Sequence, residues 1–370
     1  MRLAERMSHI DASGIRRMFE LASRLENPVN LSIGQPDFDV PEPLKEAAVR
    51  AIREGRNGYT PTQGLEALRE RISAHLRRRG IEHEMVLVTP GASAGLTLAF
   101  MVLAGPGDEI LVPDPYFVSY RQLARACGAR PVYYDTYPDF LPRPERMEEV
   151  LSERTVALVV NSPNNPTGAV YGEQTVRAVV EFARRHRLTV ISDECYDAFW
   201  YGEPPASPGR YYPQTVTVNS FSKLSAMTGW RLGYAAGPRW ALEAMATLQQ
   251  FTFVCAPQPV QWAALEAFEV DFEPVRRAYR RKRDLLYRGI RDHYRVKEAA
   301  GAFYLYPQVP AEGMTGEEFC LRAVERRLLA VPGGVFSRRD GHFRLSFAAP
   351  EEALEEGAEI LRGLAEELAP

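Results

Sequence analysis

Short apolar runs alternate with amphipathic stretches through much of the chain, and this alternation constrains the fold more than any other feature. The runs are rich in Val, Ile and Leu, which is typical of strands buried on both faces, and they occupy residues 85–89, 109–112, 156–160, 188–192 and 215–219. Helical periodicity between them predicts helices over residues 64–78, 93–103 and 173–186. Together these features predict an α/β fold, with a mostly parallel sheet flanked by helices and functional loops at the carboxyl ends of its strands.

The pattern changes after about residue 271. Three helices and two strand-like segments are predicted there, at residues 272–292, 317–327, 351–368, 302–306 and 343–347 respectively. This mixture indicates a smaller α+β domain, and a chain of 370 residues is long enough for two domains. We expect an N-terminal segment associated with the small domain (residues 1–43), a large domain (residues 44–271) and a small domain (residues 272–370).

The bulk composition argues against several classes of protein. A net charge of −3 offers no electrostatic basis for binding nucleic acid or an anionic membrane. No run of about 18 apolar residues is present, so no membrane span is predicted. The charged N-terminus lacks the apolar core of a secretory signal, and the four cysteines show no C-x-x-C spacing. We therefore expect a cytoplasmic protein with reduced thiols and no metal site.

The segment S-F-S-K-L-S-A-M-T-G-W-R-L-G, residues 220–233, follows the last of the predicted strands in the alternating region. It contains Lys223, one of only four lysines, among hydroxyl-bearing and small residues, with Arg231 eight positions later. A lysine that forms an imine must lose its proton, and desolvation or a neighbouring cation lowers its pKa. Arg231 can hold a phosphate, together with hydroxyls from Ser220 and Ser222. The alternative is a surface loop with an ordinary lysine.

A carboxylate stands at the end of another predicted strand. Asp193, in I-S-D-E-C-Y, comes directly after the apolar run at 188–192, and Tyr196 follows three positions later. A buried carboxylate requires a specific partner because an unpaired buried charge is costly. Asp193 is thus a candidate ligand-binding acid, and the alternative is that it caps the next turn.

Two further loops follow predicted strands. N-S-P-N-N-P-T-G, residues 161–168, is a stiff loop in which turn formation explains the prolines but does not require both Asn164 and Asn165. T-P-G-A-S, residues 89–93, places small residues between a strand and a helix, where free backbone N–H groups can bind a phosphate. The second loop lacks the G-x-G-x-x-G pattern of a dinucleotide site, and small-residue turns of this kind are also common as plain structure.

In their order and spacing, these motifs resemble those of the class I/II aminotransferases of pyridoxal-5′-phosphate (PLP) fold type I. The resemblance covers nearly the whole chain: a phosphate turn, S-P-N-N-P-T-G, D-E-x-Y, S-x-S-K-x-x-x-M-T-G-W-R-x-G and a distant arginine. It implies PLP as cofactor and a ping-pong transfer of an amino group from an acidic, aromatic or large apolar L-amino acid to a 2-oxo acid such as 2-oxoglutarate. It also implies a homodimer with shared active sites.

The resemblance implies a role for each matching residue. Lys223 would hold the cofactor as an imine and shuttle a proton. Further contacts to the cofactor would come from Ala92, Ser93, Phe117, Asn165, Asp193, Tyr196, Ser220, Ser222, Arg231 and, across the dimer, Tyr59. The substrate would be bound by Gly34, Asn165 and Arg344. Phe117 is a departure, since many relatives have Trp or Tyr at the stacking position.

Some of these positions have an alternative explanation. Phe117 and Tyr59 are equally suited to a hydrophobic core, and Arg344 alternates with apolar residues, as a solvent-facing arginine on a strand would. No arginine is marked for a side-chain carboxylate, and Arg338 and Arg339 are only weak candidates.

Two other functions are compatible with parts of the sequence. A PLP-dependent lyase or synthase, for example a C–S lyase, would use the same lysine, aspartate and arginine. A transcription regulator with this fold would need a DNA-binding extension of about 60 residues. We expect none, because the I-G-Q-P-D-F segment already begins at residue 33.

Overall fold

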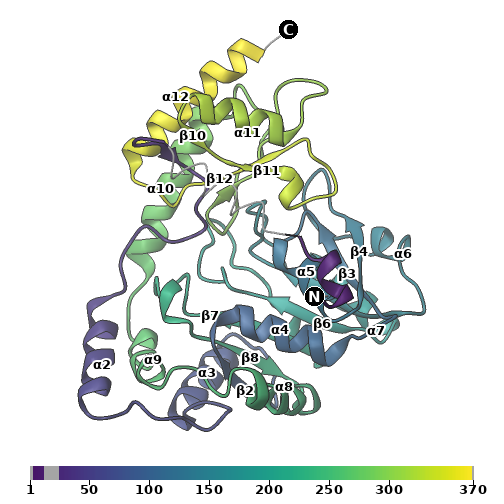
Figure 1. The fold of residues 1–370 in the computed structure, drawn as a ribbon, viewed down its shortest axis with the longest axis vertical. Coiled ribbons are helices and arrows are strands. Elements are labelled where there is room, and N and C mark those ends of the chain that lie inside the picture. Colours follow the sequence, from purple (N-terminus) through teal and green to yellow (C-terminus); the bar gives the residue numbers. More distant parts are fainter. Residues whose placement is uncertain (1–2, 12–24, 369–370) are drawn as a thin grey trace.

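The structure, a computed structural model, describes residues 3–11 and 25–368. It confirms the predicted mixed α/β architecture (Figure 1). We expected residues 1–43 to associate with the C-terminal part. Residues 1–2 and 12–24 of this segment lie outside the described residues.

A seven-stranded sheet forms the centre of the larger part of the structure. Its strands, in spatial order, are β2 (Met85–Thr89), β8 (Gly233–Gly237), β7 (Thr215–Ser220), β6 (Thr189–Asp193), β5 (Thr155–Asn161), β3 (Glu109–Asp114) and β4 (Arg130–Asp135). Strands β3 to β7 run parallel, and β8 is antiparallel to both of its neighbours. The sheet is therefore mostly parallel, as predicted. Strands β4 and β8 were not predicted, because their sequences, RPVYYD and GYAAG, lack a run of Val, Ile and Leu.

Consecutive residues of the central strands enter different hydrophobic cores on the two faces of the sheet. Ala157 and Val159 of β5 pack with residues of α4 (Gly91–Leu103) and α8 (Arg239–Thr252), whereas Leu158 and Val160 pack with α7 (Glu173–Arg185). Burial on both faces explains the near-continuous apolar runs in the sequence. Because both faces are covered, the ends of the strands are left as places for a ligand.

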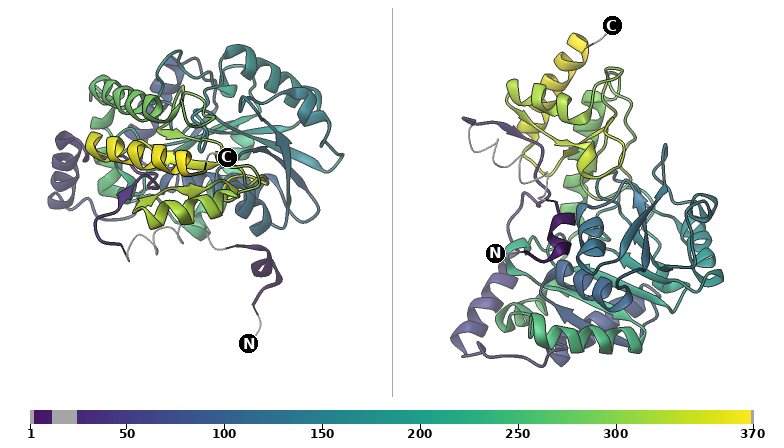
Figure 2. Two further views of the ribbon diagram at one scale, coloured as in Figure 1. Left: turned by 90° about the horizontal axis from the view of Figure 1, so that it is seen from above. Right: turned by 45° about the vertical axis from the view of Figure 1, so that its right-hand side comes forward.

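The C-terminal part of the chain (residues 273–368) lies above the sheet in Figure 1. It contains α10 (Glu273–Ile290), α11 (Gly316–Glu325), α12 (Glu351–Leu368) and a three-stranded sheet in the order β11 (Val331–Pro332), β12 (Phe343–Ser346) and β9 (Tyr304–Leu305). The N-terminal strand β1 (Val29–Asn30) pairs in parallel with β10 (Leu328–Leu329), beside α12 (Figure 2). The N-terminal strand therefore lies within the C-terminal part, and residues near position 30 are close to those near position 345.

The remaining helices surround the large sheet and connect the two parts. They are α2 (Glu42–Arg53), α3 (Glu66–Arg78), α5 (Val118–Ala126), α6 (Pro144–Glu148) and α9 (Gln258–Ala263), with short 3₁₀ helices at Glu5–His9, Pro208–Arg210, Thr228–Trp230, Glu266–Phe268 and Gly333–Val335. Within residues 3–11 and 25–368, no helix is long and apolar enough to cross a membrane, and no group of three or more His, Cys, Asp or Glu could hold a metal ion.

Candidate active site

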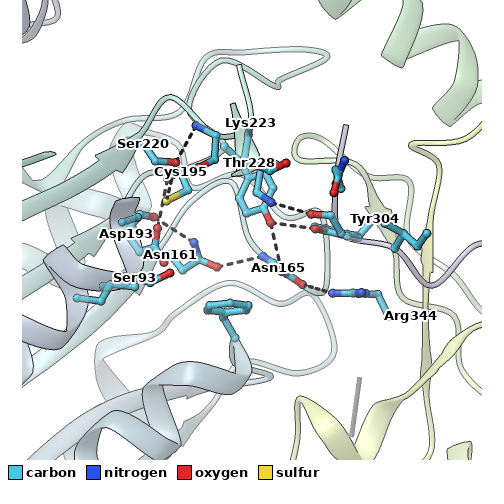
Figure 3. Close-up of a pocket in the computed structure, with 18 of the residues that line it drawn as sticks. Ser93, Asn161, Asn165, Asp193, Cys195, Ser220, Lys223, Thr228, Tyr304 and Arg344 are labelled. Carbon is cyan, nitrogen blue, oxygen red and sulfur yellow. Dashed lines mark hydrogen bonds between the residues drawn. The ribbon is translucent and has the colours of Figure 1, made fainter. Parts of the chain in front are cut away.

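A cavity of about 360 Å³ lies where the carboxyl ends of β5, β6 and β7 meet the C-terminal part of the chain (Figure 3). It is lined by all but one of the predicted site residues: Gly34, Ala92, Ser93, Phe117, Asn165, Asp193, Tyr196, Ser220, Ser222, Lys223, Arg231 and Arg344. Tyr59 is the exception, with 84% of its surface exposed outside the cavity. The strand order explains the convergence of the residues that follow β5, β6 and β7, because parallel neighbours deliver their following loops to one edge of the sheet, whereas Gly34 and Arg344 come from other segments.

Lys223 extends into this cavity from the loop that follows β7. Its Nζ donates a hydrogen bond of 2.7 Å to the carbonyl oxygen of Gly34 and lies 5.8 Å from the centre of the Tyr196 ring. Burial lowers the pKa of Lys223 to about 8, and the positive charges of Arg344 and Arg231 act in the same direction. A substantial fraction of the amine is therefore neutral near physiological pH, as a nucleophilic lysine requires.

Asp193, the last residue of β6, is only 4% exposed. Its Oδ2 accepts a hydrogen bond of 2.7 Å from the hydroxyl of Tyr120, and its Oδ1 accepts one of 3.2 Å from the backbone N–H of Cys195. Burial raises the pKa of Asp193, and these hydrogen bonds oppose that shift. Both donors are neutral, so the carboxylate is suited to a ligand that brings a positive charge. The bond to Cys195 also shows that Asp193 caps the following turn, so the two interpretations from the sequence are compatible.

The two asparagines of the loop at residues 161–168 have different surroundings. Asn164 accepts hydrogen bonds from the backbone and side chain of Thr167, which closes the loop on itself. Asn165 instead faces the cavity: its Oδ1 accepts from Nη1 of Arg344 at 3.0 Å, and its Nδ2 donates to the Tyr196 hydroxyl at 3.3 Å. In Figure 3, Asn165 lies between Asp193 on one side and Arg344 on the other. Asn164 thus serves the turn itself, and Asn165 is the asparagine that turn formation does not explain and that faces the cavity.

An anion-binding corner lies at the start of α4. Pro90 precedes this 13-residue helix and no side chain caps it, so its first N–H groups remain available. Gly91 has a φ of +80°, and a Cβ there would lie 2.5 Å from Nη2 of Arg231. The same Nη2 lies 3.5 Å from the hydroxyl of Ser93. A helix N-terminus, an arginine and a serine hydroxyl together suit a phosphate group.

Arg344 projects from β12 and is 1% exposed, so it is not the solvent-facing strand residue that the alternating pattern also allowed. Its guanidinium lies between the rings of Tyr304 and Phe336, at 4.5 and 4.7 Å from their centres. Nη2 donates to the backbone oxygen of Ser32 at 2.7 Å, and Nε is buried without a partner. A buried guanidinium that bonds only neutral groups and retains a free donor suits a carboxylate.

Several residues at the site were not found from the sequence. They are Ile33, Gln35, Leu96, Asn161, Cys195, Thr228 and Tyr304, which line the cavity, and Tyr120, which bonds Asp193. Asn161 could have been found, since it begins the predicted loop; its side chain donates to the backbone oxygen of Asp193 at 3.0 Å. Tyr304 lies in a strand among other aromatic residues, and no motif distinguishes it.

The arrangement defines a class of protein: one cavity holds a lysine of lowered pKa, a buried acid, an uncapped helix start beside an arginine, and a second, buried arginine with an unpartnered Nε. Residues 26–361 match the aminotransferase class I and II family, and the chain belongs to it. The chain is 37% identical to the aspartate aminotransferase of Pyrococcus horikoshii over 368 residues, which cover 95% of this chain and 94% of that protein. It is 39% identical to the aspartate/prephenate aminotransferase of Thermus thermophilus over 360 residues, or 93% and 92% of the two chains.

Solved structures agree with this assignment. The Thermus thermophilus aspartate aminotransferase with maleate has a TM-score of 0.93 at 37% identity, covering 98% of this chain and 100% of that one. The aromatic aminotransferase of Pyrococcus horikoshii has a TM-score of 0.89 at 34% identity, covering 95% and 99%. This chain is therefore a PLP-dependent aminotransferase of fold type I, and the alternative of a lyase is not favoured.

The residues of the cavity fit PLP. The buried carboxylate of Asp193 has only neutral donors and suits the cationic pyridine nitrogen, while the uncapped start of α4 beside Arg231 suits the phosphate. Lys223, whose pKa is lowered by burial, lines the same cavity and is suited to be the amine that would bond the cofactor aldehyde.

Proposed function

We propose that this enzyme moves an amino group from an acidic, aromatic or large apolar L-amino acid to a 2-oxo acid such as 2-oxoglutarate, by a ping-pong mechanism. One observation carries the proposal: the same cavity is lined by Lys223, an amine of lowered pKa, and by Arg344, a buried guanidinium whose Nε has no partner. Every amino acid and 2-oxo acid has an α-carboxylate, so one arginine serves both half-reactions. The names of the relatives, which include aspartate and aromatic aminotransferases, support this range of donors.

The proposed roles divide the cavity into a cofactor end and a substrate end. PLP, when bound, stabilises negative charge that develops at the substrate Cα. With the cofactor bound, Lys223 would hold and move the proton at the substrate Cα, and Asp193 would keep the pyridine nitrogen protonated. Asn165 and Tyr196 bond the phenolic oxygen, and Phe117 stacks on the ring. The phosphate contacts come from Ala92, Ser93, Ser220, Ser222 and Arg231.

The substrate end holds the α-carboxylate. Arg344 binds it as a fork of donors whose direction is fixed by Asn165 and Ser32. Gly34 contributes a backbone contact, and its carbonyl oxygen already holds Nζ of Lys223. The two residues considered for a side-chain carboxylate do not line the cavity: Arg339 bonds Asp135, and Arg338 is exposed.

A panel of amino donors against 2-oxoglutarate and pyruvate tests the proposed activity. Initial rates should give parallel lines in double-reciprocal plots, because the first product leaves before the second substrate binds. Glutamate should act as a donor in one half-reaction, with an acidic, aromatic or large apolar partner in the other. Intersecting lines, or release of ammonia and a thiol from cysteine derivatives without an acceptor, would contradict the proposal and favour lyase chemistry.

We also propose a homodimer in which each subunit completes the other's site. Tyr59 is 84% exposed and Phe251 is 83% exposed, while Phe253 and Val254 are partly exposed nearby in sequence. Large apolar side chains exposed in this way favour a protein partner, and two-fold dimers are the commonest symmetric assembly. In this proposal Tyr59 reaches the phosphate of the neighbouring subunit.

Mixing two defective variants tests this sharing. A Tyr59→Phe subunit and a Lys223→Ala subunit each form impaired homodimers, but their heterodimer has one site with an intact lysine and an intact tyrosine. Activity should therefore rise on mixing. An active monomer in sedimentation velocity, or no gain on mixing despite exchange of subunits, would rule out shared sites.

Two further proposals concern organisation and location. The domain boundaries at residues 43/44 and 271/272 are proposed from the sequence. The pairing of β1 with β10 supports the association of residues near position 30 with the C-terminal part, whereas Asp11 pairs with Arg121 and Arg125 of α5. A cytoplasmic location is supported by Cys127, Cys195, Cys255 and Cys320, which are all free thiols. Cell fractionation with an activity assay would test the location.

A further inference from the structure

Two tyrosine hydroxyls meet inside the cavity, and only one of them has a role in the proposed function. The hydroxyl of Tyr304, on β9, lies 2.9 Å from that of Tyr196, which follows β6. Both side chains are buried. Since either oxygen could donate to the other, the direction of this hydrogen bond decides which proton is free to point into the cavity.

Neighbouring groups fix the proton arrangement around Tyr196. Nη1 of Arg344 can only donate, so the atom of Asn165 that it meets must be the amide oxygen. The amide nitrogen of Asn165 therefore faces Tyr196 and donates to its hydroxyl oxygen at 3.3 Å. Tyr196 thus already accepts one hydrogen bond, which increases its capacity to donate its own proton elsewhere. Burial raises the pKa of Tyr196 well above its ordinary value, so that proton is retained.

The surroundings of Tyr304 make it the donor of the pair, because the Tyr196 hydroxyl is the one hydrogen-bond partner that the Tyr304 hydroxyl has among the described residues. Burial raises the pKa of Tyr304, so its proton is retained, although the Arg344 guanidinium, 4.5 Å from the centre of its ring, opposes that shift. The backbone of Gly34 closes the other side, because a Cβ there would lie 2.8 Å from the Tyr304 hydroxyl. Tyr196 is therefore the acceptor within reach of the Tyr304 proton.

We propose that Tyr304 is a positioning residue: its hydroxyl donates to Tyr196 and so directs the Tyr196 proton toward the phenolic oxygen of the cofactor. This inference rests on the proposed function, in which Tyr196 bonds that oxygen. Tyr304 then acts at both ends of the site, since its ring packs on the guanidinium of Arg344 while its hydroxyl orients Tyr196.

The consequence is measurable in the absorbance of the bound cofactor as pH changes. A proton donated by Tyr196 stabilises negative charge on the phenolic oxygen, which then holds the neighbouring proton on the lysine nitrogen less strongly. The pH at the midpoint of this absorbance change, called the titration midpoint below, is thereby kept low. Within the described part of the chain, the other titratable or charged groups that face Tyr196 are Arg344, Cys195, Lys223 and Tyr120, and the test changes none of them.

The test compares Tyr304→Phe, Tyr196→Phe and wild type, each loaded with PLP. Tyr304→Phe removes one hydroxyl and keeps the ring on Arg344. Since a neutral hydrogen bond contributes about 0.5–1.5 kcal/mol and one pKa unit equals about 1.4 kcal/mol, the midpoint should rise by roughly half a unit to one unit. Tyr196→Phe should raise it further. The KM for the substrate carboxylate should change less than about two-fold in Tyr304→Phe, because the guanidinium keeps its contacts.

Tyr201→Phe is the matched control. Tyr201 is also buried, and its hydroxyl bonds the backbone oxygen of Ala302 outside the cavity, so this variant loses a buried hydroxyl without touching the site. Its melting temperature should fall while its midpoint stays that of wild type.

Three results would overturn the inference, and they differ in what else they affect. A midpoint in Tyr304→Phe equal to that of wild type, alongside a raised midpoint in Tyr196→Phe, would refute the role of Tyr304 alone. An unchanged midpoint in Tyr196→Phe would refute the proposed role of Tyr196 as well. Absence of a pH-dependent chromophore on Lys223 in wild type would refute the proposed function itself.

Discussion

Replacing Arg344 with lysine tests the proposed carboxylate site most directly. The arginine is fixed by two kinds of contact, hydrogen bonds to Asn165 and Ser32 and packing between two aromatic rings, while its buried Nε has no partner. Lysine keeps the positive charge but has a single nitrogen on a flexible stem. It cannot bond Asn165 and Ser32 and also present two parallel donors to a carboxylate.

The expected loss follows from the hydrogen bonds that lysine cannot form. A hydrogen bond to a charged group contributes about 1.5–3 kcal/mol, and a ten-fold change corresponds to about 1.4 kcal/mol. Arg344→Lys should therefore lower kcat/KM by roughly 10- to 150-fold. The factor should be similar for every amino donor and 2-oxo acceptor, since all of them share the α-carboxylate. The absorbance spectrum of the bound cofactor should stay close to that of wild type.

Initial rates with several donors and acceptors, measured for Arg344→Lys and wild type, provide the assay. Arg283→Lys is the matched control, because Arg283 is also buried and bonds the backbone oxygen of Ala299 and the carboxylate of Glu298, away from the cavity. Its kcat/KM should not change. A loss in Arg344→Lys confined to dicarboxylic substrates would refute the proposed role, because Arg344 would then bind the side-chain carboxylate of the substrate instead of its α-carboxylate.

Three further predictions follow from the site. Because burial lowers the pKa of Lys223 to about 8, the rate constant for binding PLP to the cofactor-free enzyme should rise about ten-fold per pH unit below that value and level off above it; a rate that still rises at pH 10 would contradict the assignment. Lys223→Ala should abolish the yellow chromophore, and borohydride reduction of wild type should label the peptide that contains Lys223 and no other. Tyr120→Phe removes a donor to Asp193 and so raises the pKa of that carboxyl; kcat should fall about 2- to 12-fold in steady-state assays, and an unchanged kcat would show that the Tyr120 hydrogen bond is not needed.

Much of the large sheet and of the cofactor end could be predicted from the sequence. Strands buried on both faces require continuous apolar runs, so β5, β6 and β7 were visible as such, with ends that differ by at most one residue in the structure. The polar residues that follow those runs, such as Asp193 and Lys223, were then placed by the rule that parallel strands end at one edge. This inference needed only local sequence and the topology of α/β folds.

The substrate end could not be predicted in this way, because it is assembled from segments far apart in the chain. Ser32, Asn165 and Arg344 meet only because β1 pairs with β10 and the C-terminal part packs over the end of the large sheet. Tyr120 and Tyr304 likewise have no motif, since their function depends on the single hydroxyl that each brings to a partner on another element. A local sequence pattern reports burial and periodicity, whereas the direction of a hydrogen bond between distant side chains depends on how the elements pack. Local sequence therefore determined the fold class and the positions of Asp193 and Lys223 at strand ends, and the family resemblance implied which residues contact the cofactor and the substrate. Only the tertiary structure decided which side chains hold and orient those residues.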